Sequence, residues 1–179
     1  MSQYIQLLKG VISSVIVISL TILVAINISP DWLGTWGSLF INAMVPTQIV
    51  ISLLWRAEYP KPIAKLPQPL KGLCFSGLTI LIGYLIGYMA LITIGGGLTP
   101  PAPYAIMYLI ISVPVTLWLI VPLQCWPIKL FVKNEGLQGI AILFFSYLIS
   151  YLLYKTLFNF SFANGAPFYQ IALDPAGLL

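Results

Sequence analysis

Five long apolar segments, separated by short polar or proline-rich turns, are the feature that most constrains this chain. Crossing about 30 Å of hydrocarbon takes about 20 helical residues at a rise of about 1.5 Å per residue. We therefore expect membrane spans at about residues 11–28, 38–55, 73–94, 104–126 and 140–158. The predicted fold class is all-α: a polytopic transmembrane helical bundle of about five spans, in a single membrane domain covering residues 1–179.

The composition indicates that lipid, and not water, is the solvent of these segments. Hydrophobic residues make up 60% of the chain and charged residues only 7%, with a mean hydropathy of +1.00. A soluble domain carries about 25% charged residues. The net charge of +4 does not indicate nucleic-acid binding, because Lys and Arg are confined to short loops. The expected partner is the lipid bilayer, with no nucleic acid.

The basic residues also predict an orientation. If the amino terminus faces the cytoplasm, the inner segments contain all but one of the eight Lys and Arg residues, the exception being Lys155. Short loops rich in Lys and Arg stay on the cytoplasmic side. We therefore expect a cytoplasmic amino terminus and an outer carboxyl tail, and the favoured location is a bacterial inner membrane.

A weak internal repeat accompanies the spans. Leu70-Lys71-Gly72 repeats Leu8-Lys9-Gly10, and Leu137-Gln138-Gly139 is a looser copy, while Val113-Pro114-Val115 resembles Val45-Pro46-Thr47. Parallel helical hairpins at 8–69, 70–136 and 137–179 would explain this pattern, with residues 166–179 in the place of a sixth helix. The alternative is that apolar helices resemble each other by composition alone.

One segment resembles a known group of proteins. Trp32-Leu33-Gly34-Thr35-Trp36, followed by a helix with Pro46 in its middle and Arg56 at its end, is similar to the signature of a family of small two-helix bacterial membrane proteins of unknown function. The resemblance implies a helical hairpin and carries no chemistry.

Five polar or kink-forming residues are the candidate site: Asn42, Pro46, Gln48, Pro114 and Thr116. A proline inside a span frees a carbonyl one turn earlier, which a neighbour must satisfy in lipid, and Asn42 has the right spacing to do so at Pro46. Asn42 and Gln48 are costly in hydrocarbon and are expected to face the bundle interior. The alternative role for all five is structural, as kinks and interhelical hydrogen bonds.

Two further stripes lie on single helices. Gly83 and Gly87 are spaced for close helix packing. Tyr147, Tyr151 and Tyr154 form an aromatic face, for which helix packing is the favoured role and binding of a quinone or a lipid headgroup the alternative.

Catalysis has little support in the sequence. Histidine is absent, and the four carboxylates, Asp31, Glu58, Glu135 and Asp174, all lie outside the expected spans. The two cysteines show no metal-binding spacing. We therefore expect no catalytic residues, no metal and no cofactor.

Three functions remain open. The first is a small permease-like or transport-associated protein for an uncharged solute, with the five candidate residues along its path. The second is a non-catalytic subunit or scaffold of a larger membrane complex, with other membrane subunits or further copies of the chain as partners. A membrane enzyme is the third and least favoured hypothesis.

Overall fold

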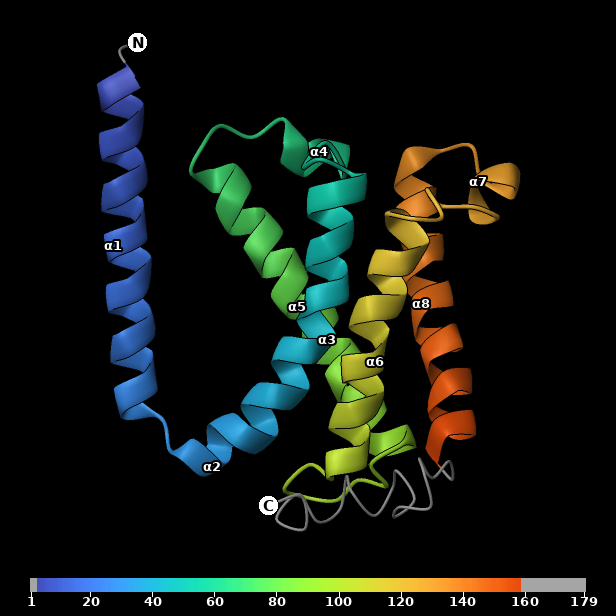
Figure 1. Cartoon of the computed structure of the whole chain (residues 1–179). Coiled ribbons are helices and arrows are strands. Elements are labelled where there is room, and N and C mark those ends of the chain that lie inside the picture. Colours follow the sequence, from blue (N-terminus) through green and yellow to red (C-terminus); the bar gives the residue numbers. More distant parts are fainter. Residues whose placement is uncertain (1–2, 159–179) are drawn as a thin grey trace. The chain divides into compact units, whose positions relative to one another are not determined.

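The computed structural model describes residues 3–158, and all regular secondary structure in that range is helical (Figure 1). In chain order the elements are α1 (Gln3–Asn27), α2 (Pro30–Trp32), the π-helical turn η1 (Leu33–Gly37), α3 (Ser38–Ile49), the π-helical turn η2 (Val50–Leu54), α4 (Lys61–Ala64), α5 (Leu70–Thr93), α6 (Pro103–Ile120), α7 (Ile128–Phe131) and α8 (Glu135–Phe158). The predicted all-α class is confirmed. The expected place of a sixth helix, at residues 166–179, lies outside the described residues.

The membrane-spanning character of the helices is also confirmed. Four stretches among the described residues are long and apolar enough to cross a bilayer: Pro30–Leu54, Leu70–Thr93, Pro103–Ile120 and Glu135–Leu157. A shorter apolar stretch, Ser14–Asn27, lies in α1. The chain is thus an integral, multi-pass membrane protein with a bundle of about five spans.

One helix end differs from the expectation. α6 ends at Ile120, before the predicted end of that span at 126, so Pro122 lies in the following turn and not inside a span. Proline cannot donate to the helical ladder. The turn closes instead with longer-range hydrogen bonds, from Leu123 N to Trp118 O at 3.2 Å and from Cys125 N to Leu119 O at 2.8 Å.

The chain divides into two compact parts, residues 1–34 and a main body that starts at Thr35. The first part contains α1 and α2. Ser29 caps α2, because the backbone N–H of Trp32 donates to Ser29 Oγ at 3.3 Å, and Pro30 occupies the first position of the helix, where its missing N–H costs nothing.

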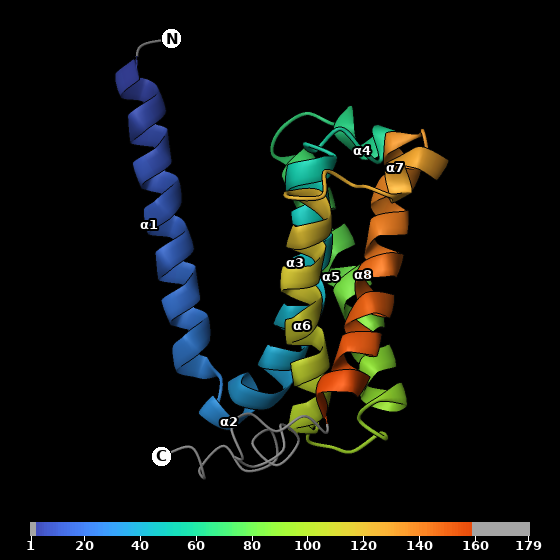
Figure 2. The same ribbon diagram turned by 45° about the vertical axis from the view of Figure 1, so that its right-hand side comes forward.

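In the main body, α3 lies between α5 and α6. It packs against both, and α6 packs against α8, whereas α5 and α6 contact each other much less although they are consecutive. Figures 1 and 2 show α3 and α6 running toward the end that carries α4 and α7, and α5 and α8 running back from it.

The main body contains a structural repeat. The first repeat, residues 38–93, consists of a proline-containing helix with a π-helical end, a four-residue helix and a 24-residue helix. The second repeat, residues 103–158, has a proline-containing helix without a π-helical end, again followed by a four-residue α7 and a 24-residue α8. Its proline, Pro114, lies 68 positions after Pro46 (114 − 46). The expected hairpin units, which start at residues 8, 70 and 137, remain a prediction. The first unit contains residues from both compact parts, and the placement of these parts relative to each other is not determined.

The turns within the two repeats are built alike. Arg56 and Ala57 in the first, and Gln124 and Cys125 in the second, have left-handed backbone conformations with φ between 47° and 67°. Ala57 N donates to Ile51 O at 2.9 Å, and the equivalent bond from Cys125 N to Leu119 O measures 2.8 Å. Such a match in local conformation is stronger evidence of repetition than shared composition.

Packing inside each repeat matches as well. Phe40 lies 5.6 Å from Tyr84 between ring centroids, and the equivalent rings of Tyr108 and Tyr151 lie 6.5 Å apart. The buried residues of the long helices recur every fourth position, Phe75, Thr79, Gly83 and Gly87 in α5 and Ile142, Ser146, Ser150 and Tyr154 in α8. Each pair in these two series is 67 positions apart (for example 142 − 75).

Candidate functional site

Small hydroxyl side chains gather in the interior, on α3 and on the packed pair α6 and α8. The fully buried ones are Thr47, Ser112, Thr116, Ser146 and Ser150. Thr116 and Ser150 donate to carbonyls of their own helices, Ser112 O at 2.7 Å and Ser146 O at 2.6 Å. Because Thr116 and Ser150 are small and their hydroxyls are satisfied within their own helices, they let neighbouring helices approach closely.

Two of the buried hydroxyls differ from the others. Thr47 Oγ1 and Ser146 Oγ are buried without a hydrogen-bond partner. A buried hydroxyl that makes no hydrogen bond costs about 1–3 kcal/mol. They lie on different helices, α3 and α8. At these two interior positions the hydroxyl forms no hydrogen bond within or between helices.

The structure places the two candidate amides differently from the expectation. Asn42 is half-buried and donates its Nδ2 to Ser38 O at 2.8 Å, so it does not cover the backbone freed by Pro46. Gln48 lies on the exposed side of α3 and not in the interior. Its Oε1 accepts from Thr79 Oγ1 at 3.1 Å and its Nε2 donates to Ser52 Oγ at 3.2 Å, so it ties α3 to α5.

The backbone around Pro46 is held by a tyrosine from another helix. Tyr147 of α8 donates its hydroxyl to Ala43 O, in the turn before Pro46, at 3.1 Å. Tyr108 of α6 in turn donates to Tyr147 O at 3.3 Å. The proline itself is fully buried, and the π-helical turn η2 follows it. Tyr147 thus binds the carbonyl next to Asn42 O, the one that lacks an N–H partner because of Pro46.

The second proline has different surroundings. Pro114 is exposed on the outer side of α6, although it is the repeat equivalent of the buried Pro46. Thr116, two residues later, is fully buried and bonded to its own helix. The five candidate residues therefore do not come together: Pro46 and Thr116 are in the interior, Asn42 is half-buried, and Gln48 and Pro114 face outward.

A polar cavity of about 490 Å³ lies at the end of the main body that carries α4 and α7. Its charged lining residues are Arg56, Glu58, Lys129, Lys133 and Glu135, and all five are exposed. Cys125, also in the wall, is buried outside the spans, and burial raises the pKa of its thiol while Lys129 opposes the shift. A raised pKa keeps the thiol protonated, so this cysteine is a poor nucleophile.

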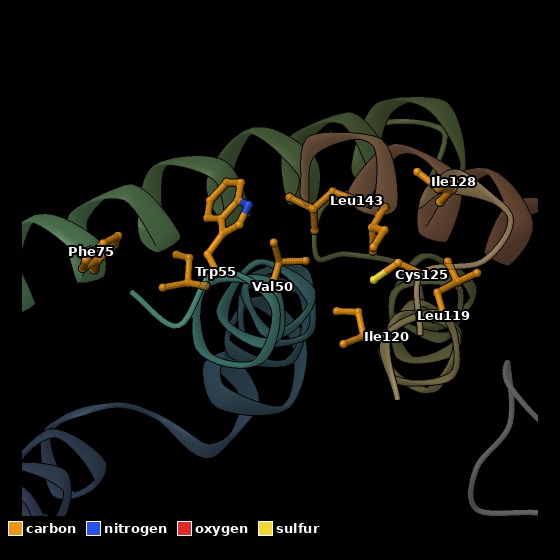
Figure 3. Packing of buried hydrophobic residues seen from close by; sticks show 10 residues of the cluster. Val50, Trp55, Phe75, Leu119, Ile120, Cys125, Ile128 and Leu143 are labelled. Carbon is orange, nitrogen blue, oxygen red and sulfur yellow. The ribbon is translucent and has the colours of Figure 1, made fainter. Parts of the chain in front are cut away.

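One contact in that wall was not indicated by the sequence. The indole of Trp55 lies directly on Gly139 of α8, where a Cβ atom would collide with the ring. Trp55 Nε1 also donates to Glu135 O at 3.0 Å. Figure 3 shows Trp55 and Val50 in the same cluster as Ile120, Cys125 and Leu143. The only hint in the sequence was the glycine in Leu137-Gln138-Gly139.

The glycine stripe of α5 has the predicted role. A Cβ atom on Gly83 would collide with Met44, and one on Gly87 would lie 3.0 Å from the ring of Phe40. Both glycines thus allow α3 to approach α5 closely. Among the described residues there is no group of three or more His, Cys, Asp or Glu side chains that could hold a metal ion.

Fold and contacts together define a class: a multi-pass, all-α membrane protein whose main body is built from two copies of one helical unit. Beyond that class, comparison with known proteins gives no further assignment, because no protein-family model, no curated protein and no solved structure matches the chain.

Proposed function

We propose that the chain is a non-catalytic subunit or scaffold of a larger membrane assembly. The observation that carries the proposal is the unequal coverage of equivalent helix faces. Val50 of the first repeat is 0% exposed because it packs in the core, whereas its equivalent in the second repeat, Trp118, is 67% exposed. The helix face that is buried in the core in the first repeat is thus exposed in the second repeat.

The fate of the polar candidates supports the same proposal. Asn42 and Thr116 bond to their own helices, Gln48 joins α3 to α5, and Pro46 is packed in the core. These residues serve helix packing, which is the work of a structural subunit.

The proposed location is the bacterial inner membrane, with the amino terminus and the α4 and α7 loops in the cytoplasm. Support comes from the basic residues, which cluster in the loops around α4 and α7. Arg56, Lys61, Lys65, Lys129 and Lys133 all lie there, as the retention of Lys and Arg on the cytoplasmic side requires.

A permease-like function for an uncharged solute is the second candidate. The specific observation in its favour is that a π-helical turn follows Pro46 inside one span, since such turns often occur at functional sites. Its test is stopped-flow swelling of proteoliposomes in glycerol or urea. Swelling faster than that of protein-free vesicles, and slowed by Pro46→Ala, would favour transport over the structural proposal.

The structural proposal is tested by photo-crosslinking in membranes of the natural host. A photoreactive amino acid at Trp118 or Gln48 is expected to give adducts heavier than one chain. Leu85 and Leu152, which are equivalent positions exposed to 54% and 56%, are matched controls and are expected to give none. If Trp118 and Gln48 also gave only uncrosslinked chain, the subunit proposal would be wrong.

A further inference from the structure

The contact between the two repeats joins two different surfaces. We call the first surface the ridge; in the first repeat it consists of Leu39, Ala43, Pro46 and Val50 on α3 and η2, all fully buried. The second surface is the groove; in the second repeat it consists of Leu109, Thr116 and Ile120 on α6 with Gly139 and Leu143 on α8. Val50, Ile120 and Leu143 share one core cluster, and Leu39, Ala43 and Leu109 share another.

Within the main body, neither the remaining ridge nor the remaining groove is covered by another helix. The ridge of the second repeat, Met107, Ile111, Pro114 and Trp118, is half-buried or exposed at every position. The groove of the first repeat consists of Ile41, Gln48, Ser52, Gly72 and Ser76, all of which are exposed. Ile41 is 57% exposed, whereas its equivalent Leu109 is 0% exposed.

The open groove is hollow at the place where the other groove is filled. A cavity of about 500 Å³ is lined by residues that include Gln48, Ser52, Gly72 and Ser76. In the second repeat the corresponding glycine, Gly139, is covered by the indole of Trp55. A Cβ atom on Gly72, in contrast, would meet only Gln68 Oε1, at 3.6 Å. The hollow therefore lies at the position that Trp55 fills in the other groove.

The chemistry of the open groove argues against lipid as its permanent cover. Gln48, Ser52 and Ser76 are polar side chains in otherwise apolar spans, and all three are exposed. Polar side chains in hydrocarbon are costly and usually face other helices. The equivalent of Gln48 is Thr116, which is fully buried in the internal contact.

Other outward-facing positions are exposed to the same degree in both repeats. Leu85 and Leu152 are equivalent, at 54% and 56% exposed, and Leu81 and Leu148 are exposed in both repeats as well. The outer sides of α5 and α8 are thus treated alike, as lipid-facing surfaces should be. At the ridge and the groove, in contrast, equivalent positions differ strongly in exposure between the repeats.

We propose that a second copy of this chain covers the open groove, inserting the ridge of its second repeat into the groove of the first. This inference rests on the proposed subunit function and names the partner. Trp118 and Leu123, the equivalents of Val50 and Trp55, fill the hollow beside Gly72. The contact is head-to-tail, which means that the ridge of one copy meets the groove of the next. A contact with twofold symmetry buries the same surface on both partners, whereas inside the chain Val50 is buried and its equivalent Trp118 is exposed. Both repeats run in the same direction, so all copies keep one orientation in the membrane (Figures 1 and 2).

The test uses the full chain, expressed alone and reconstituted in phosphatidylethanolamine and phosphatidylglycerol vesicles. Cys74→Ala and Cys125→Ala remove the native thiols. Chains with Leu123→Cys and chains with Gly72→Cys, carrying different tags, are mixed and treated with a short bismaleimide. A head-to-tail contact predicts cross-links between the two kinds of chain. It predicts none between two Leu123→Cys chains or between two Gly72→Cys chains. Trp55→Cys with Gly139→Cys in one chain is the positive control and links within the chain.

A second measurement covers the case in which a cysteine variant folds poorly. Energy transfer between labelled chains reports self-association at increasing dilution in lipid. Trp118→Ala is expected to weaken association by about tenfold or more, as removal of a central aromatic anchor does. Leu85→Ala is the matched control and is expected to leave association unchanged.

The outcomes separate this inference from the proposed function. Links between like chains, or monomers at every dilution, would each overturn the head-to-tail contact. If the chain alone is monomeric while Trp118 and Gln48 give heavy adducts in host membranes, the subunit function stands and the second copy does not. If the host membranes give no adducts either, both are wrong.

Discussion

The contact of Trp55 with Gly139 is expected to tolerate little added volume. In Gly139→Ala a methyl group would enter the indole ring, so the ring must move and lose its hydrogen bond to Glu135 O. Overpacking of this kind costs about 1–3 kcal/mol. The free energy of unfolding in mixed micelles is expected to fall by that amount. Gly77→Ala, where no atom lies within 4 Å, is the control and should cause no loss.

Thr47 offers the opposite test, because its hydroxyl is buried and makes no hydrogen bond. Thr47→Val keeps the shape and removes the unsatisfied group, so stability is expected to stay equal or to rise by up to about 1 kcal/mol. Thr116→Val, which deletes a 2.7 Å bond to Ser112 O, serves as the comparison and should lower stability slightly. A larger loss in Thr47→Val than in Thr116→Val would show that Thr47 has a polar partner, such as an internal water.

At the scale of helices, the Tyr147 hydroxyl links α8 to α3 beside Pro46. Tyr147→Phe removes the donor to Ala43 O and leaves that carbonyl without its side-chain bond. Interhelical bonds in membrane proteins contribute about 0.6 kcal/mol on average, with a maximum of about 1.7. A loss within that range is expected on unfolding in mixed micelles. Tyr84→Phe keeps its ring stacked on Phe40 and is the matched control; an equal loss in both variants would contradict the role of the hydroxyl.

The elements were largely predictable, because length, apolarity and proline-rich turns are properties of local sequence. The close approach of α5 through Gly83 and Gly87 was predictable for the same reason. The end of α6 was not, since residues 121–126 are apolar except for Gln124 and proline is common in membrane helices.

The arrangement of the candidate residues was out of reach of local sequence. Pro46 and Pro114 share the same flanking valine, yet one is buried and the other exposed. That difference comes from the insertion of α3 between α5 and α6, which is a long-range packing event. Gln48 was expected in the bundle interior, but it lies on an exposed face. The proposed second copy would bury this face.

For the molecule as a whole, the repeat explains how a chain with so few polar groups specifies its packing. Each repeat has a ridge and a groove. The ridge of the first repeat packs in the groove of the second, which leaves one ridge and one groove exposed. Since hydrophobic burial does not drive association in lipid, shape and a few polar contacts must select the partner. The hollow beside Gly72 provides the shape, and Gln48, Ser52 and Ser76 provide the polar contacts.

The proposed orientation leads to a prediction about access from the two sides of the membrane. On a background without native cysteines, Leu98→Cys lies in the turn between α5 and α6, and Lys65→Cys lies in the loop after α4. If Lys and Arg hold the α4 and α7 end inside, a membrane-impermeant maleimide added to intact spheroplasts labels Leu98→Cys at once. Lys65→Cys reacts only after the membrane is permeabilised. The reverse pattern would invert the topology and place the charged cavity around Arg56 and Lys129 on the outer surface, where the charge asymmetry would have no explanation.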